Sequence, residues 1–360
     1  KVELSHVYFS YVPEQKLIED FNLSVKPGQR VAIVGPTGCG KTTLINLLMR
    51  FYDVNSGTIK VSDIPQQQLT RKSLRDNYGM VLQETWLRSG SIRDNIAMGK
   101  PDATDEEIIA AAKASHAHGF IKRLPNGYDT MITEDGGNLS SGQKQLLTIA
   151  RAMLSDPKIL ILDEPTAVLT PQETEKLFNI LRKMKAQGCA IIIITHKLGE
   201  VMDISDRVTI LRKGKSVETV NTAESSEKQL TELMVGKAVE LSIERPEPVN
   251  VKPILNVVDL TVKNSEGSIA LDDVSFVINR GEILGVAGIA GSGQKELCET
   301  IAGLQKIEKG AVLYNKENII GKTPKEIINL GISMSFIPED RLGMGLIASV
   351  GMTDNMLLKT

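Results

Sequence analysis

Histidine and cysteine are scarce in this chain, which has four histidines and three cysteines among 360 residues. Cys39, Cys189 and Cys298 are far apart and form no C-x-x-C pair, which excludes a zinc or dithiol site of the usual spacing. Unpaired thiols of this kind are typical of a reducing compartment. No apolar run approaches the roughly 18 residues that a membrane-spanning helix needs. Any association with a membrane is therefore expected to come through a partner.

An excess of positive charge is also absent. Lys and Arg total 42 and Asp and Glu total 44, so the formal net charge is −2. This balance lacks the basic footprint of a nucleic-acid-binding protein, and we expect no nucleic-acid partner. Apolar residues at 41% and charged residues at 24% are typical of a globular protein. A length of 360 residues favours two domains over one.

The chain contains an internal repeat. Five glycines recur 253 positions later, the first of them from 28 to 281; the pairs are Gly28 and Gly281, Gly35 and Gly288, Gly38 and Gly291, Gly40 and Gly293, Gly57 and Gly310. We expect a complete domain at 1–240, a proline-rich linker at 241–253, and a second copy at 254–360 that is truncated and degenerate. Because the chain starts at Lys1 without methionine or a signal peptide, we expect it to be a piece of a longer protein.

The apolar pattern predicts an α/β fold. Short apolar runs at 31–34, 159–162 and 191–195 alternate with helical patterns at 42–51 and 171–186, as in a parallel sheet covered by helices. The alternating segment 2–11 is expected to form an antiparallel β subdomain beside that sheet. Residues of about 85–156 are mainly helical in pattern and are expected to form a helical subdomain.

Residues 35–42 read Gly-Pro-Thr-Gly-Cys-Gly-Lys-Thr and follow a predicted strand directly before a predicted helix. This is the spacing of a phosphate-binding P-loop, in which backbone N–H groups converge on phosphates, Lys41 adds positive charge and the Thr42 hydroxyl ligates Mg²⁺. A chance glycine turn is the alternative, and the strand–loop–helix context disfavours it. We predict a P-loop NTPase that binds ATP and Mg²⁺.

The apolar run at 159–162 ends in two carboxylates, Asp163 and Glu164. Acidic residues at the end of a strand are often only solvated turn residues. In a chain with a P-loop, we instead expect Asp163 to bind Mg²⁺ and Glu164 to deprotonate the attacking water.

Residues 139–143, Leu-Ser-Ser-Gly-Gln, complete a set of motifs that resembles the ATP-binding cassette (ABC) ATPases. The resemblance implies an ABC-type nucleotide-binding domain that dimerises head to tail, so that this signature pentapeptide closes over the γ-phosphate held by the opposing subunit. It also implies an adenine-stacking role for Tyr11, a metal-linking and catalytic role for Gln83, and a γ-phosphate-sensing role for His196. Each of these three has a plain structural alternative: a core tyrosine, an exposed amide, and a strand-end histidine. The predicted nucleotide-binding residues are Tyr11, Gly35, Pro36, Thr37, Gly38, Cys39, Gly40, Lys41, Thr42, Thr43, Ser140, Ser141, Gly142 and Gln143; the predicted metal ligands are Thr42, Gln83 and Asp163; the predicted catalytic residues are Glu164, His196 and Gln83.

Two parts of the chain resemble two different subfamilies of these ATPases. Residues 1 to about 164, including 87–96 and 124–129, resemble an exporter-type multidrug or lipid cassette, whereas residues from about 165 onward, including 165–173 and 338–341, resemble the tandem ATPase of sugar and nucleoside importers. The chain is therefore interpreted as a chimera of the two. Thr170 stands where exporters usually have an aspartate. In the second copy Gln294 and Lys295 stand where the first has Lys41 and Thr42, so we expect that copy to have lost catalysis.

The resemblance implies an ATPase that powers solute transport through partner transmembrane domains at the cytoplasmic face of the membrane. The alternative is a soluble ABC ATPase acting on DNA or ribosomes; the chain shows neither the long coiled coil nor the charged helical linker of such proteins. The substrate and the direction of transport stay open. Trp86 is expected on the partner-facing surface, with burial as the alternative, and the thiol pKa of Cys39 is expected to be low because it precedes a helix.

Overall fold

The computed structural model describes residues 1–83, 85–133, 138–237, 251–264, 267–288, 292–332, 335, 337, 345–347 and 349–357. The chain divides into two compact units, Lys1–Leu241 and Ser242–Thr360. Most of the expected linker at 241–253 and all of the importer-like segment 338–341 lie outside the described residues. In the part of the chain that is described, no helix is both long and apolar enough to span a membrane.

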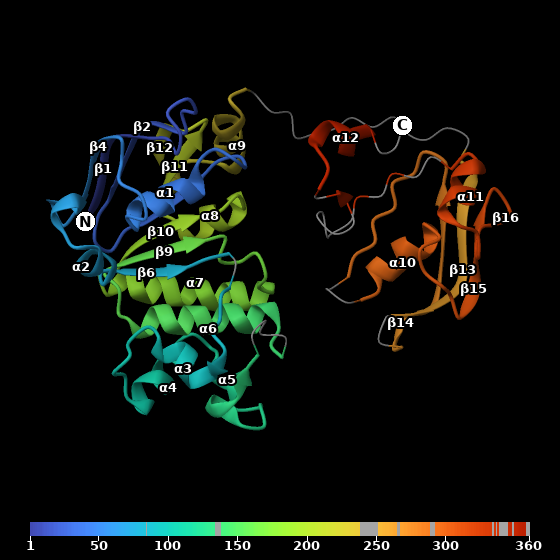
Figure 1. Ribbon diagram of the computed structural model, residues 1–360, viewed down its shortest axis with the longest axis horizontal. Helices are drawn as coiled ribbons and strands as arrows, with labels where there is room; N and C mark the ends of the chain where they lie inside the picture. The colour runs from blue at the N-terminus through green and yellow to red at the C-terminus, as the bar shows by residue number, and fades with distance from the viewer. Residues whose placement is uncertain are drawn as a thin grey trace. The chain divides into compact units, whose positions relative to one another are not determined.

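The centre of the first unit is a six-stranded sheet with the order β12-β11-β3-β10-β9-β6 (Figure 1). Its strands are β3 (Arg30–Val34), β6 (Tyr78–Val81), β9 (Ile159–Asp163), β10 (Ala190–Ile194), β11 (Arg207–Arg212) and β12 (Lys215–Asn221). All neighbours pair in parallel except β12, which runs antiparallel to β11. The predicted strands at 31–34, 159–162 and 191–195 are confirmed as β3, β9 and β10. Every residue of β10 is buried, and each buried isoleucine contributes roughly 1.5–3 kcal/mol.

An antiparallel sheet of order β2-β1-β4-β5 covers one side of the unit. Its strands are β1 (Val2–Phe9), β2 (Ile18–Val25), β4 (Ser56–Val61) and β5 (Ile64–Pro65). The apolar residues of β1 and β2 share one core with helix α1 (Lys41–Leu48) and with β3, β9 and β10. Helix α1 is therefore enclosed between the two sheets, and this burial fixes the direction in which its N-terminus points.

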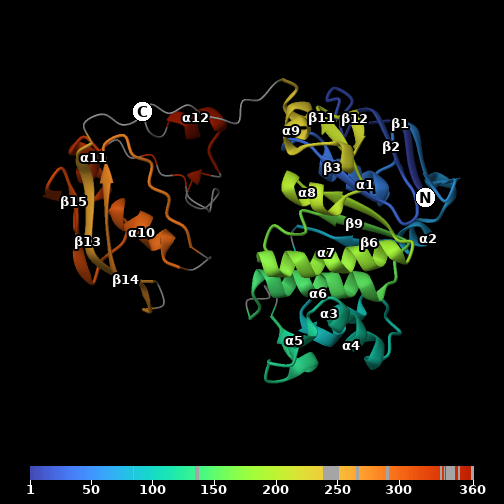
Figure 2. The same ribbon diagram turned by 180° about the vertical axis from the view of Figure 1, so that it is seen from behind.

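Helices α6 (Ser141–Leu154) and α7 (Pro171–Ala186) lie along the other face of the parallel sheet (Figures 1 and 2). Beyond them are α3 (Ile92–Ala97), α4 (Asp105–Ala114) and α5 (His118–Ile121), with the short strands β7 (Gly90–Ser91) and β8 (Met131–Ile132) and the 3₁₀ turn η2 (Gly127–Asp129). The buried residues of these helices join those of β9 and β10 in a second core.

Four of these helices begin at a capping box, which is readable in the sequence as Ser or Thr followed three residues later by Asp, Glu or Gln. The N-cap residues are Ser91, Thr104, Ser140 and Thr170. Each cap satisfies backbone donors that the first turn leaves free and contributes about 1 kcal/mol. The local sequence therefore sets where α6 and α7 begin, beside the predicted functional segments.

The first unit is completed by α2 (Arg71–Arg75), α8 (Leu198–Ile204), α9 (Glu227–Val235), η1 (Gln66–Gln68) and η3 (Thr222–Glu224). Residues of α8 and α9 pack with those of β3 and β11 in a small third core.

The second unit repeats part of the first. Its sheet has the order β14-β13-β15-β16, which corresponds strand by strand to β2-β1-β4-β5, and helix α10 occupies the place of α1. The elements are β13 (Pro253–Lys263), β14 (Ile269–Asn279), α10 (Gln294–Ile301), β15 (Lys309–Tyr314), β16 (Glu317–Asn318), α11 (Pro324–Asn329) and α12 (Met352–Leu357).

Strand β3 has no counterpart strand in the described part of the second unit. Residues 283–287 correspond to β3 but form no strand, and Leu284 is 39% exposed whereas its counterpart Val31 is fully buried. In the first unit β3 is paired on both sides, by β10 and β11. Among the described residues of the second unit no strand pairs with 283–287, so the apolar pattern alone does not produce a strand there.

Candidate active site

The predicted chemical residues follow four adjacent strands of the parallel sheet. The glycine loop follows β3, Gln83 follows β6, Asp163 ends β9, and Thr195 and His196 follow β10. Because β3, β6, β9 and β10 run parallel, these segments all leave the same edge of the sheet, where open α/β sheets bind ligands. The strand that carries His196 lies between the strand of the P-loop and the strand of Glu164.

The glycine loop is shaped by two close approaches. Gly40 is the N-cap residue of α1 with φ of 106°, a conformation that disfavours any residue with a Cβ. A Cβ at Gly35 would collide with the backbone carbonyl of Leu211. Pro36, Thr37 and Gly38 are exposed between them, and Thr43 is buried in α1. The loop therefore presents its backbone to solvent at the N-terminus of a buried helix, which is a ready anion-binding arrangement.

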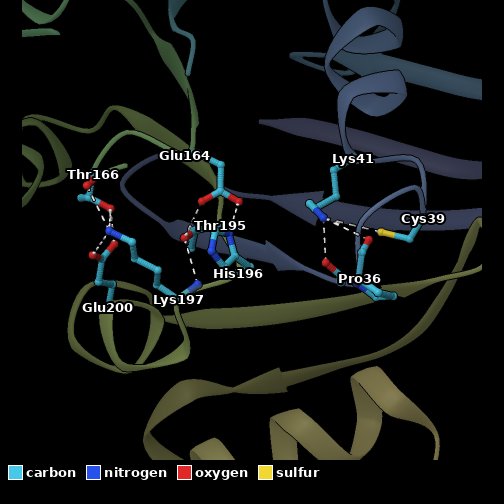
Figure 3. Close-up of polar contacts among 10 residues, drawn as sticks. Pro36, Cys39, Lys41, Glu164, Thr166, Thr195, His196, Lys197 and Glu200 are labelled. Atoms are coloured by element: carbon cyan, nitrogen blue, oxygen red, sulfur yellow. Dashed lines mark hydrogen bonds and ion pairs between the residues drawn. The ribbon is translucent and has the colours of Figure 1, made fainter. Parts of the chain in front are cut away.

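Lys41 lies over this loop. Its Nζ donates hydrogen bonds to the carbonyl oxygens of Gly35 at 2.7 Å and Pro36 at 3.1 Å (Figure 3). Among the described residues no carboxylate forms an ion pair with Lys41. The ammonium is thus held at the mouth of the loop with its charge not neutralised by the protein, as phosphate binding requires.

Asp163 and Thr42 fit a magnesium site. Burial raises the pKa of Asp163, the neighbouring charge of Glu164 raises it further, and Lys41 lowers it. The hydroxyl-bearing Thr42 is exposed in the first turn of α1. Within the described residues no three His, Cys, Asp or Glu side chains gather as a metal cage. Mg²⁺ that arrives with nucleotide phosphates needs only one or two protein ligands, so this sparse set fits that ion.

Glu164 is buried, with 8% of its surface exposed, and both carboxylate oxygens have partners. Oε1 lies 2.7 Å from Nδ1 of His196, and Oε2 accepts a hydrogen bond from the Thr195 hydroxyl at 3.2 Å (Figure 3). The residue has φ of 45°, a left-handed conformation that costs about 1 kcal/mol and is held by its N–H bond to the Ile194 carbonyl. The loop after β10 therefore fixes the orientation of the predicted base.

A second polar cluster ties the loop after Glu164 to the start of α8. Lys197 Nζ donates to the carbonyl and the hydroxyl of Thr166 at 3.0 and 3.2 Å and pairs with Glu200 at 3.1 Å. The Thr166 hydroxyl in turn donates to Glu200 (Figure 3). Thr166 is almost fully buried. This cluster locks the segments after β9 and β10 to each other.

The signature residues begin helix α6. The Ser140 hydroxyl accepts from the Gln143 N–H at 3.2 Å, and Gln143 Oε1 accepts from the Ser140 N–H at 3.0 Å. Ser140 and Ser141 are exposed, and Gly142 is buried against Glu173 of α7. In the described part of the chain no hydrogen bond joins residues 140–143 to the loop 35–43. The structure therefore does not join the signature and the P-loop of the same unit by hydrogen bonds among the residues it describes.

Tyr11 is half exposed and belongs to an aromatic group. Its ring meets those of Phe9 and Tyr52 edge to face, each at a centroid distance of 4.9 Å. Its hydroxyl accepts a hydrogen bond from Asn46 of α1 at 3.0 Å. The alternative of a buried core tyrosine is wrong, since 48% of Tyr11 is exposed. The ring is anchored to the P-loop helix through Asn46 and remains half exposed.

Gln83 and Trp86 lie on an exposed segment that is tied to the signature helix. Gln83 is exposed, and Trp86 is 62% exposed, so the alternative that Trp86 is packed inside is wrong. Arg151 of α6 donates to the carbonyl oxygens of Trp86 at 3.3 Å and Asn95 at 2.8 Å. Asn95 bonds both backbone groups of Arg88. Arg151 and Asn95 therefore join this segment to α6 and α3.

The expectation of a low pKa for Cys39 is wrong. Burial raises the pKa of its thiol, and the opposing effects of Lys41 and of nearby backbone N–H groups are smaller. Burial likewise raises the pKa of Cys189 to about 11. Cys298 is the exposed thiol. Burial of α1 between two sheets therefore affects the thiol pKa of Cys39 more than the positive field at the helix N-terminus does.

Sequence reasoning missed several side chains of this site. Thr195 was readable from its place next to His196, and Thr170 is now seen to cap α7 with Glu173. The roles of Lys197, Glu200 and Tyr52 depend on contacts between distant segments, and no local sequence pattern indicates these roles.

Comparison with known proteins gives two kinds of relatives. A family model described as ABC transporter matches residues 18–167 and 271–349. The chain is 46% identical over 224 residues to a fatty acid ABC transporter ATP-binding/permease protein of Mycobacterium bovis, covering 62% of this chain and 35% of that protein. It is 33% identical over 344 residues to the nucleoside import ATP-binding protein NupA of Lactococcus lactis, covering 94% of this chain and 67% of that protein.

A galactose/methyl galactoside import ATP-binding protein of Haemophilus influenzae is 34% identical over 350 residues, covering 96% of this chain and 67% of that protein. A solved bacterial Atm1-family ABC exporter with ATP bound superposes with a TM-score of 0.62 and 34% identity, covering 67% of this chain and 42% of that chain. The chain thus spans about a third of the length of the exporter-type relative and about two thirds of the importer-type relatives.

Proposed function

The chain belongs to the ABC transporter family, whose ATP-binding proteins are transport ATPases that bind ATP with Mg²⁺, and we propose that its first unit hydrolyses MgATP to drive solute transport. The observation that carries the proposal is the convergence of Lys41, Glu164 and His196 at one edge of the sheet. The second unit has Gln294 in place of the lysine, and we assign hydrolysis to the first unit alone.

Different residues of the first unit bind the nucleotide and carry out its hydrolysis. Loop 35–43 and Lys41 bind the phosphates, and the exposed ring of Tyr11 stacks on the base. Glu164, oriented by Thr195 and His196, accepts the proton of the attacking water. Thr42, Asp163 and Gln83 would hold Mg²⁺, which when bound neutralises charge on the phosphates.

A complete site needs a second subunit. Among the described residues, 140–143 form no hydrogen bond with their own P-loop, yet their exposed serines and the N-terminus of α6 are suited to a phosphate. We therefore propose a head-to-tail dimer in which each signature faces the partner's P-loop.

Transport requires membrane partners. Exposed Trp86 next to Gln83, linked to α6 through Arg151, supports docking of a transmembrane domain at this segment. The proposed location is the cytoplasmic face of the membrane, with no nucleic-acid partner. The relatives include both exporter-type and importer-type proteins, and the junction of an exporter-like part with an importer-like part near 164 stays a proposal from the sequence.

The proposal is tested by Lys41→Ala. Loss of the ammonium that lies over Gly35 and Pro36 is expected to weaken MgATP binding by about tenfold or more, measured by equilibrium titration. Lys26→Ala, which removes an exposed lysine outside the loop, serves as the control. Unchanged MgATP affinity in Lys41→Ala would contradict the assignment of the nucleotide to this loop.

A further inference from the structure

A groove of about 490 Å³ opens in the helical part of the first unit, beside the signature but away from the sheet edge that carries Lys41 and Glu164. It is formed by the end of α4, by α5, and by the first turns of α6 and α7. Its lining residues are Lys113, His116, His118, Gly119, Phe120, Arg123, Ser140, Gln143, Leu146, Glu173 and Lys176. The volume is that of a small-molecule site.

The lining of the groove is strongly cationic. Lys113, Arg123 and Lys176 all line it, and in the described part of the chain none of them forms an ion pair with a carboxylate. The one lining carboxylate, Glu173, is already engaged, because its Oε2 accepts hydrogen bonds from the N–H and the hydroxyl of Thr170. Glu173 keeps its negative charge, so the lining carries three positive charges and one negative charge, a net charge of +2.

Neighbouring lysines also act on the two histidines of the groove, after burial. The pKa of His116 is lowered first by burial and then by Lys176 and Lys183. The pKa of His118 is lowered first by burial and then by neighbouring lysines. The positive charges that disfavour protonation of these histidines also attract an anion.

The N-terminus of α6 adds to this field. The helix has 14 residues and no acidic residue of its own in its first turn, and the carboxylate of Glu173 of α7, beside Gly142, offsets only part of its positive end. Ser140 and Gln143, which form its capping box, are on the wall of the groove. The buried side chains of Phe120 and Leu146 supply an apolar wall for the organic part of a ligand.

We propose that this groove binds a multiply charged phosphate group, belonging to a small phosphorylated compound or a lipid headgroup. Arg and Lys side chains are the usual ligands of such groups, and three cations match a group of more than one negative charge. Ser140 and Gln143 also belong to the proposed nucleotide site of the dimer, whereas Lys113, Arg123 and Lys176 do not. Because the anion would lie beside Ser140, it weakens the attraction of the signature for a partner's γ-phosphate, a consequence that rests on the proposed dimer.

The test uses pyrophosphate as the probe and the full chain carrying Lys41→Ala, so that binding at the P-loop is weakened. Adding Arg123→Gln and Lys176→Gln is expected to lower pyrophosphate affinity about tenfold or more in isothermal titration calorimetry. Adding Lys122→Gln instead, next to Arg123 but not lining the groove, is expected to change the affinity less than about twofold.

Vesicles containing phosphatidic acid provide the second arm. Co-sedimentation that is lost with Arg123→Gln and Lys176→Gln would identify a lipid headgroup as the source of the phosphate. The inference is overturned if the two groove substitutions leave both pyrophosphate and vesicle binding unchanged. ATP hydrolysis by the chain with intact Lys41, measured alongside, separates that result from a failure of the proposed function.

Discussion

Replacing Glu164 by glutamine tests the proposed chemistry with little structural change. The amide can keep both contacts of the carboxylate, accepting from the Thr195 hydroxyl and donating to Nδ1 of His196, which are 3.2 and 2.7 Å away in the parent. The side chain is 8% exposed, so a substitution of equal size also preserves packing. What glutamine cannot do is accept the proton of the attacking water.

General-base catalysis contributes about 10²- to 10⁴-fold to a rate. Glu164→Gln is therefore expected to lower kcat by that factor, equivalent to about 3–5 kcal/mol of transition-state stabilisation. MgATP affinity is expected to stay within about twofold, because Lys41 and the loop 35–43 are unchanged.

The assay is steady-state phosphate release together with equilibrium binding of MgATP. Glu175→Gln, which changes an exposed carboxylate of α7, is the matched control and should leave both quantities unaltered. A kcat of Glu164→Gln close to the parental value would remove this residue from the mechanism and refute the reasoning.

Two further predictions concern residues around this base. Because burial raises the folded-state pKa of Asp163 above its unfolded value, the ionised carboxylate destabilises the fold at neutral pH. Asp163→Asn should therefore raise Tm without nucleotide, and the increase should disappear in acid, where Asp163 is protonated in both states. The same substitution should abolish Mg²⁺-dependent hydrolysis. A lower Tm in differential scanning calorimetry at neutral pH would contradict this. Lys197→Met, which releases the Thr166 and Glu200 contacts, should lower kcat several-fold with little change in KM. Lys197→Arg should keep most of the parental kcat, and Lys213→Met is the control. An increase in KM alone would show that Lys197 does not position the catalytic loop.

Much of the fold was predictable because its signals are local. Apolar runs placed β3, β9 and β10, and the helical pattern at 171–186 placed α7. The glycine repeat anticipated that β13, β14 and α10 would follow the pattern of β1, β2 and α1.

The remaining features depend on contacts between distant segments. Residues 283–287 have the apolar pattern of β3 but lack its neighbours, so they form no strand. The direction of the pKa shift of the Cys39 thiol is set by burial rather than by the helix N-terminus. The clamp of Lys197, Glu200 and Thr166 exists only because β9 and β10 are adjacent.

The most direct test of the account mixes two inactive chains. Lys41→Ala lacks a working P-loop, and Ser140→Arg places a bulky cation in the signature; each is expected to have little activity alone. In a head-to-tail dimer of the two, one of the two sites keeps an intact P-loop facing an intact signature. Mixing is therefore predicted to restore ATP hydrolysis, with specific activity that rises with total protein concentration. No recovery on mixing, together with parental activity that does not depend on concentration, would contradict the shared site.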